Sequence, residues 1–129
     1  MFLRGPSLNF AIHNMLPNLY NTEDTIAAIA TSEGISAIGV IRVSGKDAFS
    51  ICNRIYKSKD LTQVKSHTIH YGFITDGEEV VDEVMLSVFK SPRSFTTEDS
   101  IEISAHGSPY LLSRILQLLL QNGARLAQP

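Results

Sequence analysis

The amino-terminal third of the chain holds an apolar segment that is interrupted by small and polar residues. From Asp24 it reads DTIAAIATSEGISAIGVIRVSG, in which two short runs rich in Ile, Ala and Val flank a Ser-Glu-Gly-Ile-Ser connector. Short apolar runs bounded by turn-forming residues are typical of β-strands. The pattern therefore predicts two strands joined by a turn.

A first helix is predicted directly after these strands. Ser44 offers a hydroxyl N-cap, and an acidic residue, Asp47, follows three positions later. The apolar residues that come next recur at helical spacing, which predicts a helix over about 46–57.

A second helix has a clear beginning and end. Ser108 and Pro109 supply an N-cap and a first-turn proline, and Asn122-Gly123 supplies a stop, so the helix covers about 108–122. Its apolar arc is wider than one narrow stripe. Such a helix is either buried on two sides or packs also against a second chain.

The remaining pattern predicts further strands. Two strand-like runs surround Asp76-Gly77, a dipeptide that suits the two-residue turn of a β-hairpin. Isoleucine alternates with polar residues over 100–104, which places Glu102 on the polar face of a strand. The final ARLAQP has the pattern of the start of another strand. The fold class is α+β, with a mixed, largely antiparallel sheet and two main helices.

Composition indicates one soluble domain. The 129 residues are 43% hydrophobic with a formal net charge of −2, which gives no electrostatic reason to expect direct contact with nucleic acid or an anionic membrane. One cysteine, Cys52, excludes an internal disulfide and a four-cysteine zinc site, and fits a reducing, cytoplasmic setting. No segment approaches the roughly 20 apolar residues of a membrane span. Residues 1–21 lack a signal-peptide core and are predicted to be a loosely ordered tail, with Met1 or Met15 as the native start.

Two stretches are similar to catalytic motifs, but each lacks a required part. GVIRVSGKD has five residues between its glycines and Asp47 after the lysine, whereas a phosphate loop needs four residues there and Ser or Thr after the lysine. AHGSPY is similar to the His-Gly runs of oxyanion holes, but the chain has no Gly-x-Ser-x-Gly elbow. We therefore predict no catalytic residue.

A metal site is not predicted either. His67 and His70 fall on opposite faces of a predicted strand. A strand would spread the other possible ligands over many ångströms, and no His-x-x-x-His pair supports them. These other residues are Glu98, Asp99, Glu102 and His106.

Arg42 and Glu102 are the candidate binding residues. Arg42 shares a strand face with apolar neighbours, and a covered arginine needs an acceptor because an unpaired buried charge is costly. Glu102 on another strand is one partner, and a ligand with donor and acceptor groups is another. The alternative is that Arg42 extends to water and Glu102 is only solvated.

A set of sequence blocks resembles the N-terminal domain of the MnmE (TrmE) family of tRNA-modification GTPases. The blocks are, in order, DTIAAIAT and GVIRVSG, HYGFI and VVDEV, SFTTEDSIEISAHGSP, and NGARLAQP. The resemblance covers about residues 22–129, and its most specific block contains Ser-Phe-Thr-x-Glu-Asp followed by Glu and His-Gly. It implies a domain similar to the tetrahydrofolate-binding module of aminomethyltransferases.

The resemblance also implies partners. The family has a helical domain and a GTPase domain that are absent from this chain, and GTP, Mg and K would belong to the latter, so this chain alone is not expected to be catalytic. A homodimer is implied, and we expect the second helix to contribute to its contact. The family modifies the wobble uridine of tRNA together with a flavin-containing partner, MnmG (GidA).

The one-carbon donor implied by the resemblance is 5-formyltetrahydrofolate or 5,10-methylenetetrahydrofolate. The family's motifs place its folate contacts on Arg42 and Glu102. The chemistry is suitable, because a pteridine offers a paired donor edge to a carboxylate and an arginine fork matches a carboxylate or carbonyl. One alternative is a dimerisation scaffold in which the two residues form a structural ion pair. A free-standing aminomethyltransferase-like enzyme is disfavoured by the length of 129 residues.

The chain departs from the family pattern at two places. Ser-Glu-Gly-Ile-Ser-Ala replaces the usual Pro-Gly-Arg-Gly-like connector, which puts a backbone contact from that loop in doubt. His106-Gly107-Ser108 replaces the usual His-Gly-Gly, and we expect this change to be tolerated because Ser108 can cap the helix.

Overall fold

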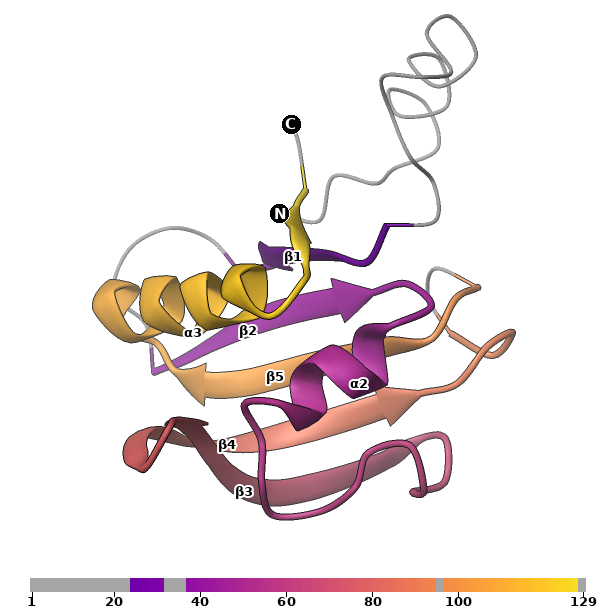
Figure 1. Cartoon of the computed structure of the whole chain (residues 1–129), viewed down its shortest axis with the longest axis horizontal. Helices are drawn as coiled ribbons and strands as arrows, with labels where there is room; N and C mark the ends of the chain where they lie inside the picture. Colours follow the sequence, from indigo (N-terminus) through magenta and orange to yellow (C-terminus); the bar gives the residue numbers. More distant parts are fainter. Residues whose placement is uncertain (1–23, 32–36, 95–96, 128–129) are drawn as a thin grey trace, which may run out of the picture.

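Both described helices lie on the same face of a six-stranded sheet (Figure 1). The structure, a computed structural model, describes residues 24–31, 37–94 and 97–127. Its elements are β1 (Ile26–Ile29), β2 (Ile38–Ser44), α2 (Ala48–Asn53), β3 (Thr68–Asp76), β4 (Glu79–Phe89), β5 (Ser100–His106), α3 (Pro109–Gln121) and β6 (Arg125–Leu126). The strand order is β3-β4-β5-β2-β1-β6, and only the β1–β6 pair among the described strands is parallel. The predicted α+β class with a mixed, largely antiparallel sheet is confirmed.

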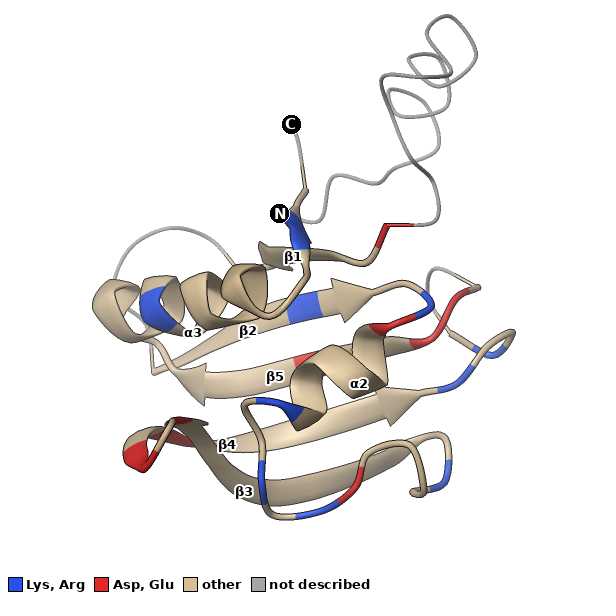
Figure 2. Ribbon diagram, viewed as in Figure 1, with Lys and Arg blue, Asp and Glu red and all other residues tan. Residues whose placement is uncertain are grey.

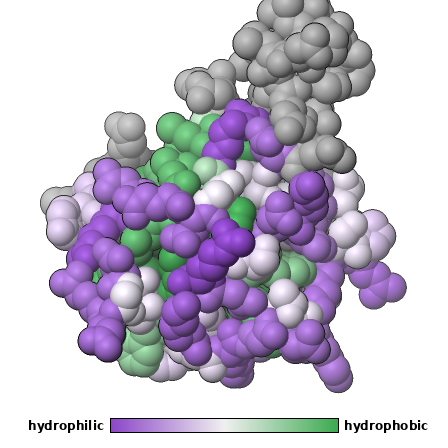
Figure 3. Space-filling view, viewed as in Figure 1, coloured by the Kyte–Doolittle hydropathy of each residue, from purple (hydrophilic) through white to green (hydrophobic). Residues whose placement is uncertain are grey.

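The core lies between the helices and the sheet because the strands alternate. Ile41 and Val43 of β2 are fully buried, as are Ile101 and Ile103 of β5, whereas the polar residues between them project from the opposite face. Seen from the helix side, the surface is mostly hydrophilic with apolar patches between (Figure 3). The alternation therefore leaves one sheet face for the core and the other for solvent or partners.

Two strand predictions at the ends of the described chain are confirmed. The first two strands are β1 and β2, which pair antiparallel. The last is β6, which pairs parallel with β1 through Ile26 and Arg125. The predicted connector between β1 and β2 falls on 32–36, and the predicted tail on 1–21, so both lie outside the described residues.

The first helix is shorter than predicted, because α2 covers only Ala48–Asn53. Ser44 is not its N-cap. It is the last residue of β2, where it pairs with Ser100 and is buried. Asp47 takes the cap position, and its backbone N–H donates to Thr25 Oγ1 at 3.0 Å. Ser44 therefore belongs to the sheet, although the sequence pattern predicted it as the N-cap of the helix.

The early end of α2 also has a tertiary cause. Ile55 accepts a hydrogen bond from the backbone N–H of Thr75 at 2.8 Å, and Tyr56 forms an isolated antiparallel bridge with Ile74. Both contacts join this part of the chain to β3, so its backbone does not continue the helix. A prediction from periodicity alone extends too far because Ile55 continues the apolar spacing although its backbone is no longer helical.

The predicted hairpin is confirmed, with its turn shifted by one residue. Asp76 pairs with Glu79, so the loop is Gly77-Glu78 rather than Asp76-Gly77. Gly77 has φ 62°, and a positive φ at the first of two loop residues is the II′ arrangement that suits a twisted hairpin. The register also shifts between Ile74 and Thr75, which marks a bulge.

The second helix agrees with its prediction. Ser108 is the N-cap, Pro109 is the first helical residue, and α3 ends at Gln121. Its leucines are buried or half-buried, and none is exposed. The structure therefore favours burial against its own chain for the wide apolar arc. Neither described helix is long and apolar enough to cross a membrane.

Candidate functional site

Arg42 and Glu102 lie directly opposite each other on neighbouring strands. β2 and β5 pair in a register that sets Arg42 against Glu102, and Arg42 Nε donates to Glu102 Oε2 at 2.7 Å. Both residues occupy the polar positions of their strands and so project from the face opposite the helices. Figure 2 shows basic colour on β2 and acidic colour on the neighbouring β5, whereas much of the other charge lies in loops and turns. Of the partners considered for Arg42 from the sequence, Glu102 is the one that it contacts in the structure.

A ligand can reach this ion pair, because its side chains are partly exposed and its neighbours are short. The side chains are 27% and 30% exposed. The neighbours across the ladder are short, with Ala28 opposite Arg42 and Ser87 opposite Glu102. An ion pair that is partly solvated contributes only about 0–1 kcal/mol to stability. A ligand that offers each side chain a better partner would therefore displace the pair at small cost.

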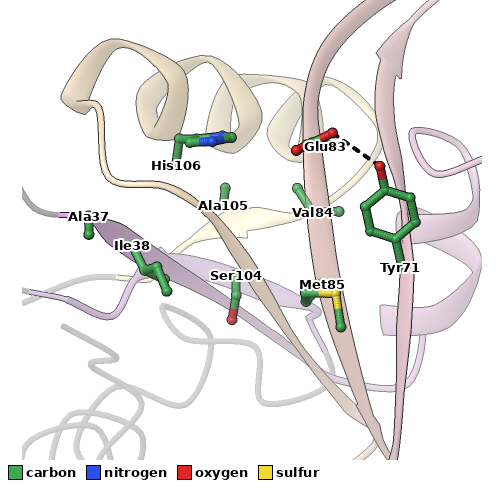
Figure 4. Close-up of a pocket in the computed structure, with 9 residues that line it drawn as sticks. All are labelled: Ala37, Ile38, Tyr71, Glu83, Val84, Met85, Ser104, Ala105 and His106. Atoms are coloured by element: carbon green, nitrogen blue, oxygen red, sulfur yellow. Dashed lines mark hydrogen bonds between the residues drawn. The ribbon is translucent and has the colours of Figure 1, made fainter.

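A hollow of about 250 Å³ lies beside the end of β5, and it is lined by the buried Val84 and Ala105 as well as by exposed residues of the open face. The β4–β5 ladder ends at Met85 and Ser104, whereas β5 continues its pairing with β2 as far as Ile38 and His106. β4 and β5 therefore diverge, and Figure 4 shows His106 and Glu83 on opposite sides of the opening. The lining residues are Ala37, Ile38, Tyr71, Glu83, Val84, Met85, Ser104, Ala105 and His106.

A buried carboxylate bridges the two diverging strands. Asp82 is 8% exposed, and its Oδ2 accepts the backbone N–H of His106 at 3.0 Å. Its Oδ1 lies 2.7 Å from His106 Nδ1 and accepts the backbone N–H of Glu83 at 2.9 Å. Asp82 thus replaces the missing ladder bonds and fixes the ring of His106, whose side chain is 60% exposed.

On the other wall of the hollow, a tyrosine hydroxyl is hydrogen-bonded to a glutamate carboxylate. Tyr71 donates its hydroxyl to Glu83 Oε2 at 3.0 Å, and this hydrogen bond raises the pKa of the Tyr71 phenol above its ordinary value. Tyr71, Met85 and Ile38 are all exposed. The hollow therefore has apolar walls with a few polar groups, which is the usual composition of a small-molecule pocket.

Sequence reasoning missed most of this hollow. It weighed His106 as a metal ligand and as part of a His-Gly motif, and it gave no role to Asp82, Glu83 or Tyr71. The alternation in VVDEV could show that Asp82 and Glu83 face opposite ways, but not that Asp82 meets His106, because that contact depends on where the β4–β5 ladder ends.

The residues weighed as metal ligands do not gather. Among the described residues, no group of three or more His, Cys, Asp or Glu side chains could hold a metal ion. Asp99 accepts the backbone N–H of Ser91 at 2.9 Å. His70 lies on β3, where burial is the main cause that lowers its pKa, and His67 precedes that strand. Cys52 is fully buried, and burial raises the pKa of its thiol.

The chain is similar to a well-populated group of proteins. Residues 25–129 match the family described as "GTP-binding protein TrmE N-terminus". Proteins named tRNA modification GTPase MnmE are 56% identical over 108 residues in Lacticaseibacillus paracasei and 56% over 106 residues in Lactococcus lactis subsp. lactis, each match covering 82% of this chain. One from Cytophaga hutchinsonii is 51% identical over 109 residues, or 84% of this chain. The chain spans about a quarter of the length of these relatives, 23% or 24%.

Proposed function

The chain belongs to the family of TrmE N-terminal domains, and from that premise we propose that it is the folate-binding and dimerisation part of a tRNA-modification GTPase. The ligand is a one-carbon tetrahydrofolate, either the 5-formyl or the 5,10-methylene form. The observation that carries the proposal is the approachable Arg42–Glu102 pair on the sheet face opposite the helices. An acceptor and a donor fork side by side suit a heterocycle that offers both donor and acceptor edges.

In this function Arg42 and Glu102 give up their hydrogen bond to each other, and each binds the ligand instead. The Glu102 carboxylate accepts the paired N–H donors of the pterin edge, and the Arg42 guanidinium donates to a carbonyl or carboxylate of the ligand. The strands hold both groups at fixed register, so the ligand is oriented as well as bound. Arg42 and Glu102 are binding residues and perform no chemistry.

The role in the complete protein follows from this. The domain positions the one-carbon donor for modification of the wobble uridine of tRNA in the cytoplasm. A flavin-containing MnmG (GidA) partner and the GTPase domain, with its GTP, Mg and K, supply the chemistry and gating. The relatives are named tRNA modification GTPase MnmE, which supports this assignment.

Calorimetric titration with 5-formyltetrahydrofolate tests the proposal. The wild-type chain should give saturable heat, and Glu102→Gln should weaken binding by at least tenfold because a neutral amide is a poorer partner for the pterin donors. Glu79→Gln is the matched control, since Glu79 also pairs with an arginine, Arg114, but at the hairpin. If Glu102→Gln binds as tightly as Glu79→Gln, these residues do not hold folate.

The alternative function is a dimerisation scaffold without a ligand. It is favoured by the direct hydrogen bond between Arg42 and Glu102, which already satisfies both charges. In that case the wild type gives no saturable heat with folate. Glu102→Gln would then change only the stability of the chain, by about 0–1 kcal/mol.

A further inference from the structure

The loop between α2 and β3 gathers positive charge on a chain that is acidic overall. Lys57, Lys59 and Lys65 are exposed on this loop, and Lys90, which follows β4, is half-buried beside it. Figure 2 shows this basic colour along the loop and past the end of β4. With the one aspartate of the loop, residues 57–67 and Lys90 have a formal charge of +3, so the rest of a chain of net charge −2 carries −5. We call these four lysines the lysine edge.

Hydrogen bonds hold the lysine edge against the sheet. Lys59 Nζ lies 3.2 Å from His70 Nδ1 on β3. The backbone N–H of Lys90 donates to Ser66 Oγ at 2.8 Å, and its Nζ donates to the backbone oxygen of Thr62 at 3.5 Å. The loop is therefore tied to both β3 and the end of β4, which keeps the four charges on one side of the molecule.

The acidic side chains of the molecule do not neutralise this edge. In the part of the chain that the structure describes, no salt bridge joins one of its lysines to a carboxylate, whereas Arg42 and Arg114 each pair with one. Asp60, the acid within the loop, accepts hydrogen bonds from the Asn53 amide and from the backbone N–H and hydroxyl of Thr62. It shapes the loop instead of pairing with a lysine, so the charge of the edge is available to a partner.

We propose that the lysine edge binds the phosphate backbone of the tRNA on which the complete protein acts, an inference that rests on the proposed function. Lysine is a compact charge on a flexible stem, and it contacts phosphates without reading sequence. Ser58 and Thr62 are exposed on the same loop, and hydroxyls also donate to phosphate oxygens. Lysine is depleted in protein–protein interfaces, which favours a nucleic acid over an acidic protein as the partner.

The lysine edge lies on the side of the sheet away from the proposed folate site. His70, which Lys59 contacts, alternates along β3 with the exposed Tyr71 and so projects from the helix side. The Arg42–Glu102 pair projects from the opposite face. A tRNA backbone held at the edge therefore leaves that face open to folate.

Fluorescence anisotropy of a fluorescein-labelled tRNA transcript measures this contact. The transcript is titrated with the wild-type 129-residue chain and with Lys59→Gln and Lys65→Gln, each of which removes one charge from the edge, at salt concentrations from about 50 to about 200 mM. Lys46→Gln is the matched control, because Lys46 is also exposed but lies in the turn between β2 and α2. The same proteins are titrated calorimetrically with 5-formyltetrahydrofolate.

Each edge variant should weaken tRNA binding about tenfold at about 50 mM salt. Each should also lower the slope of log K against log salt concentration by about one, because one phosphate contact fewer releases one counterion fewer. Lys46→Gln should change neither quantity, and all three variants should bind folate as the wild type does.

Three results would overturn the inference. The wild type may fail to bind the tRNA, or the edge variants bind it as tightly as Lys46→Gln does. In the third, labelled poly-L-glutamate binds the wild type more tightly than the tRNA at equal charge, which assigns the edge to an acidic polypeptide. None of these results touches the folate titration of the wild type. A wild type that binds tRNA through the edge but gives no saturable heat with folate would keep this contact and contradict the proposed folate binding.

Discussion

At the scale of single residues, Gly72 explains how the chain between α2 and β3 packs. A Cβ atom on Gly72 would lie 2.4 Å from Tyr56 Cε1 and 2.5 Å from Ser58 Oγ. Tyr56 is 1% exposed, and its hydroxyl donates to the backbone oxygen of Tyr71 at 2.9 Å. The ring is held both by packing and by this hydrogen bond, so it cannot move aside easily.

Gly72→Ala should therefore destabilise the chain by about 1–3 kcal/mol, the usual cost of inserting a methyl group into a packed core. Urea denaturation followed by far-ultraviolet circular dichroism measures the change. Val80→Ala, at an exposed position of the neighbouring strand β4, is the control, and it should shift stability by less than about 0.5 kcal/mol. Equal effects of the two substitutions would show that Tyr56 has room to rearrange.

The residue scale also shows what a sequence can reveal about a site. The alternation around Arg42 and Glu102 is enough to place both on polar strand positions, because the side-chain period of a strand is two. It does not reveal that they share a row of the sheet. That depends on the register between β2 and β5, which are about 60 positions apart in the chain and pair only through tertiary structure.

At the scale of elements, boundaries follow local chemistry only where no other element competes. α3 begins at the predicted residue because Ser108 has no role in the sheet, and its Oγ accepts the backbone N–H of Leu111 at 3.4 Å. α2 is shorter than predicted at both ends. β2 extends through Ser44, and Ile55 is hydrogen-bonded to Thr75 of β3. The hairpin turn differs by one residue because Asp76 pairs within the ladder.

Ser108→Ala should lower the free energy of unfolding by about 0.5–1 kcal/mol, at the lower end for an N-cap because the hydrogen bond is long. Ser113→Ala is the matched control, since Ser113 is exposed in the middle of α3. Alanine is the better helix former there, so that variant should be unchanged or slightly more stable. Thermal or urea denaturation of the two variants measures these changes. An equal loss of unfolding free energy in both would mean that Ser108 does not act as a cap.

At the scale of the whole molecule, the sheet has two unlike faces. The helices and the core cover one of them, whereas the other displays large apolar side chains. On β3 these are Ile69, Tyr71 and Phe73, at 64%, 54% and 40% exposure. A contiguous exposed apolar surface of this kind is typical of an interaction site. α3 has no exposed leucine, so its largest exposed apolar side chain is Tyr110.

On the basis of these exposures we propose that the dimer contact lies on β3 rather than on α3. Sedimentation equilibrium of the wild type should give twice the mass of one chain, and Phe73→Glu should give the mass of one, because a charge buried in an apolar contact without a partner is costly. Tyr110→Glu places the same charge on the other side of the molecule and should leave the dimer intact. The reverse result, dissociation by Tyr110→Glu alone, would assign the contact to α3. A wild type that stays monomeric at high concentration would show that the chain does not form the proposed dimer.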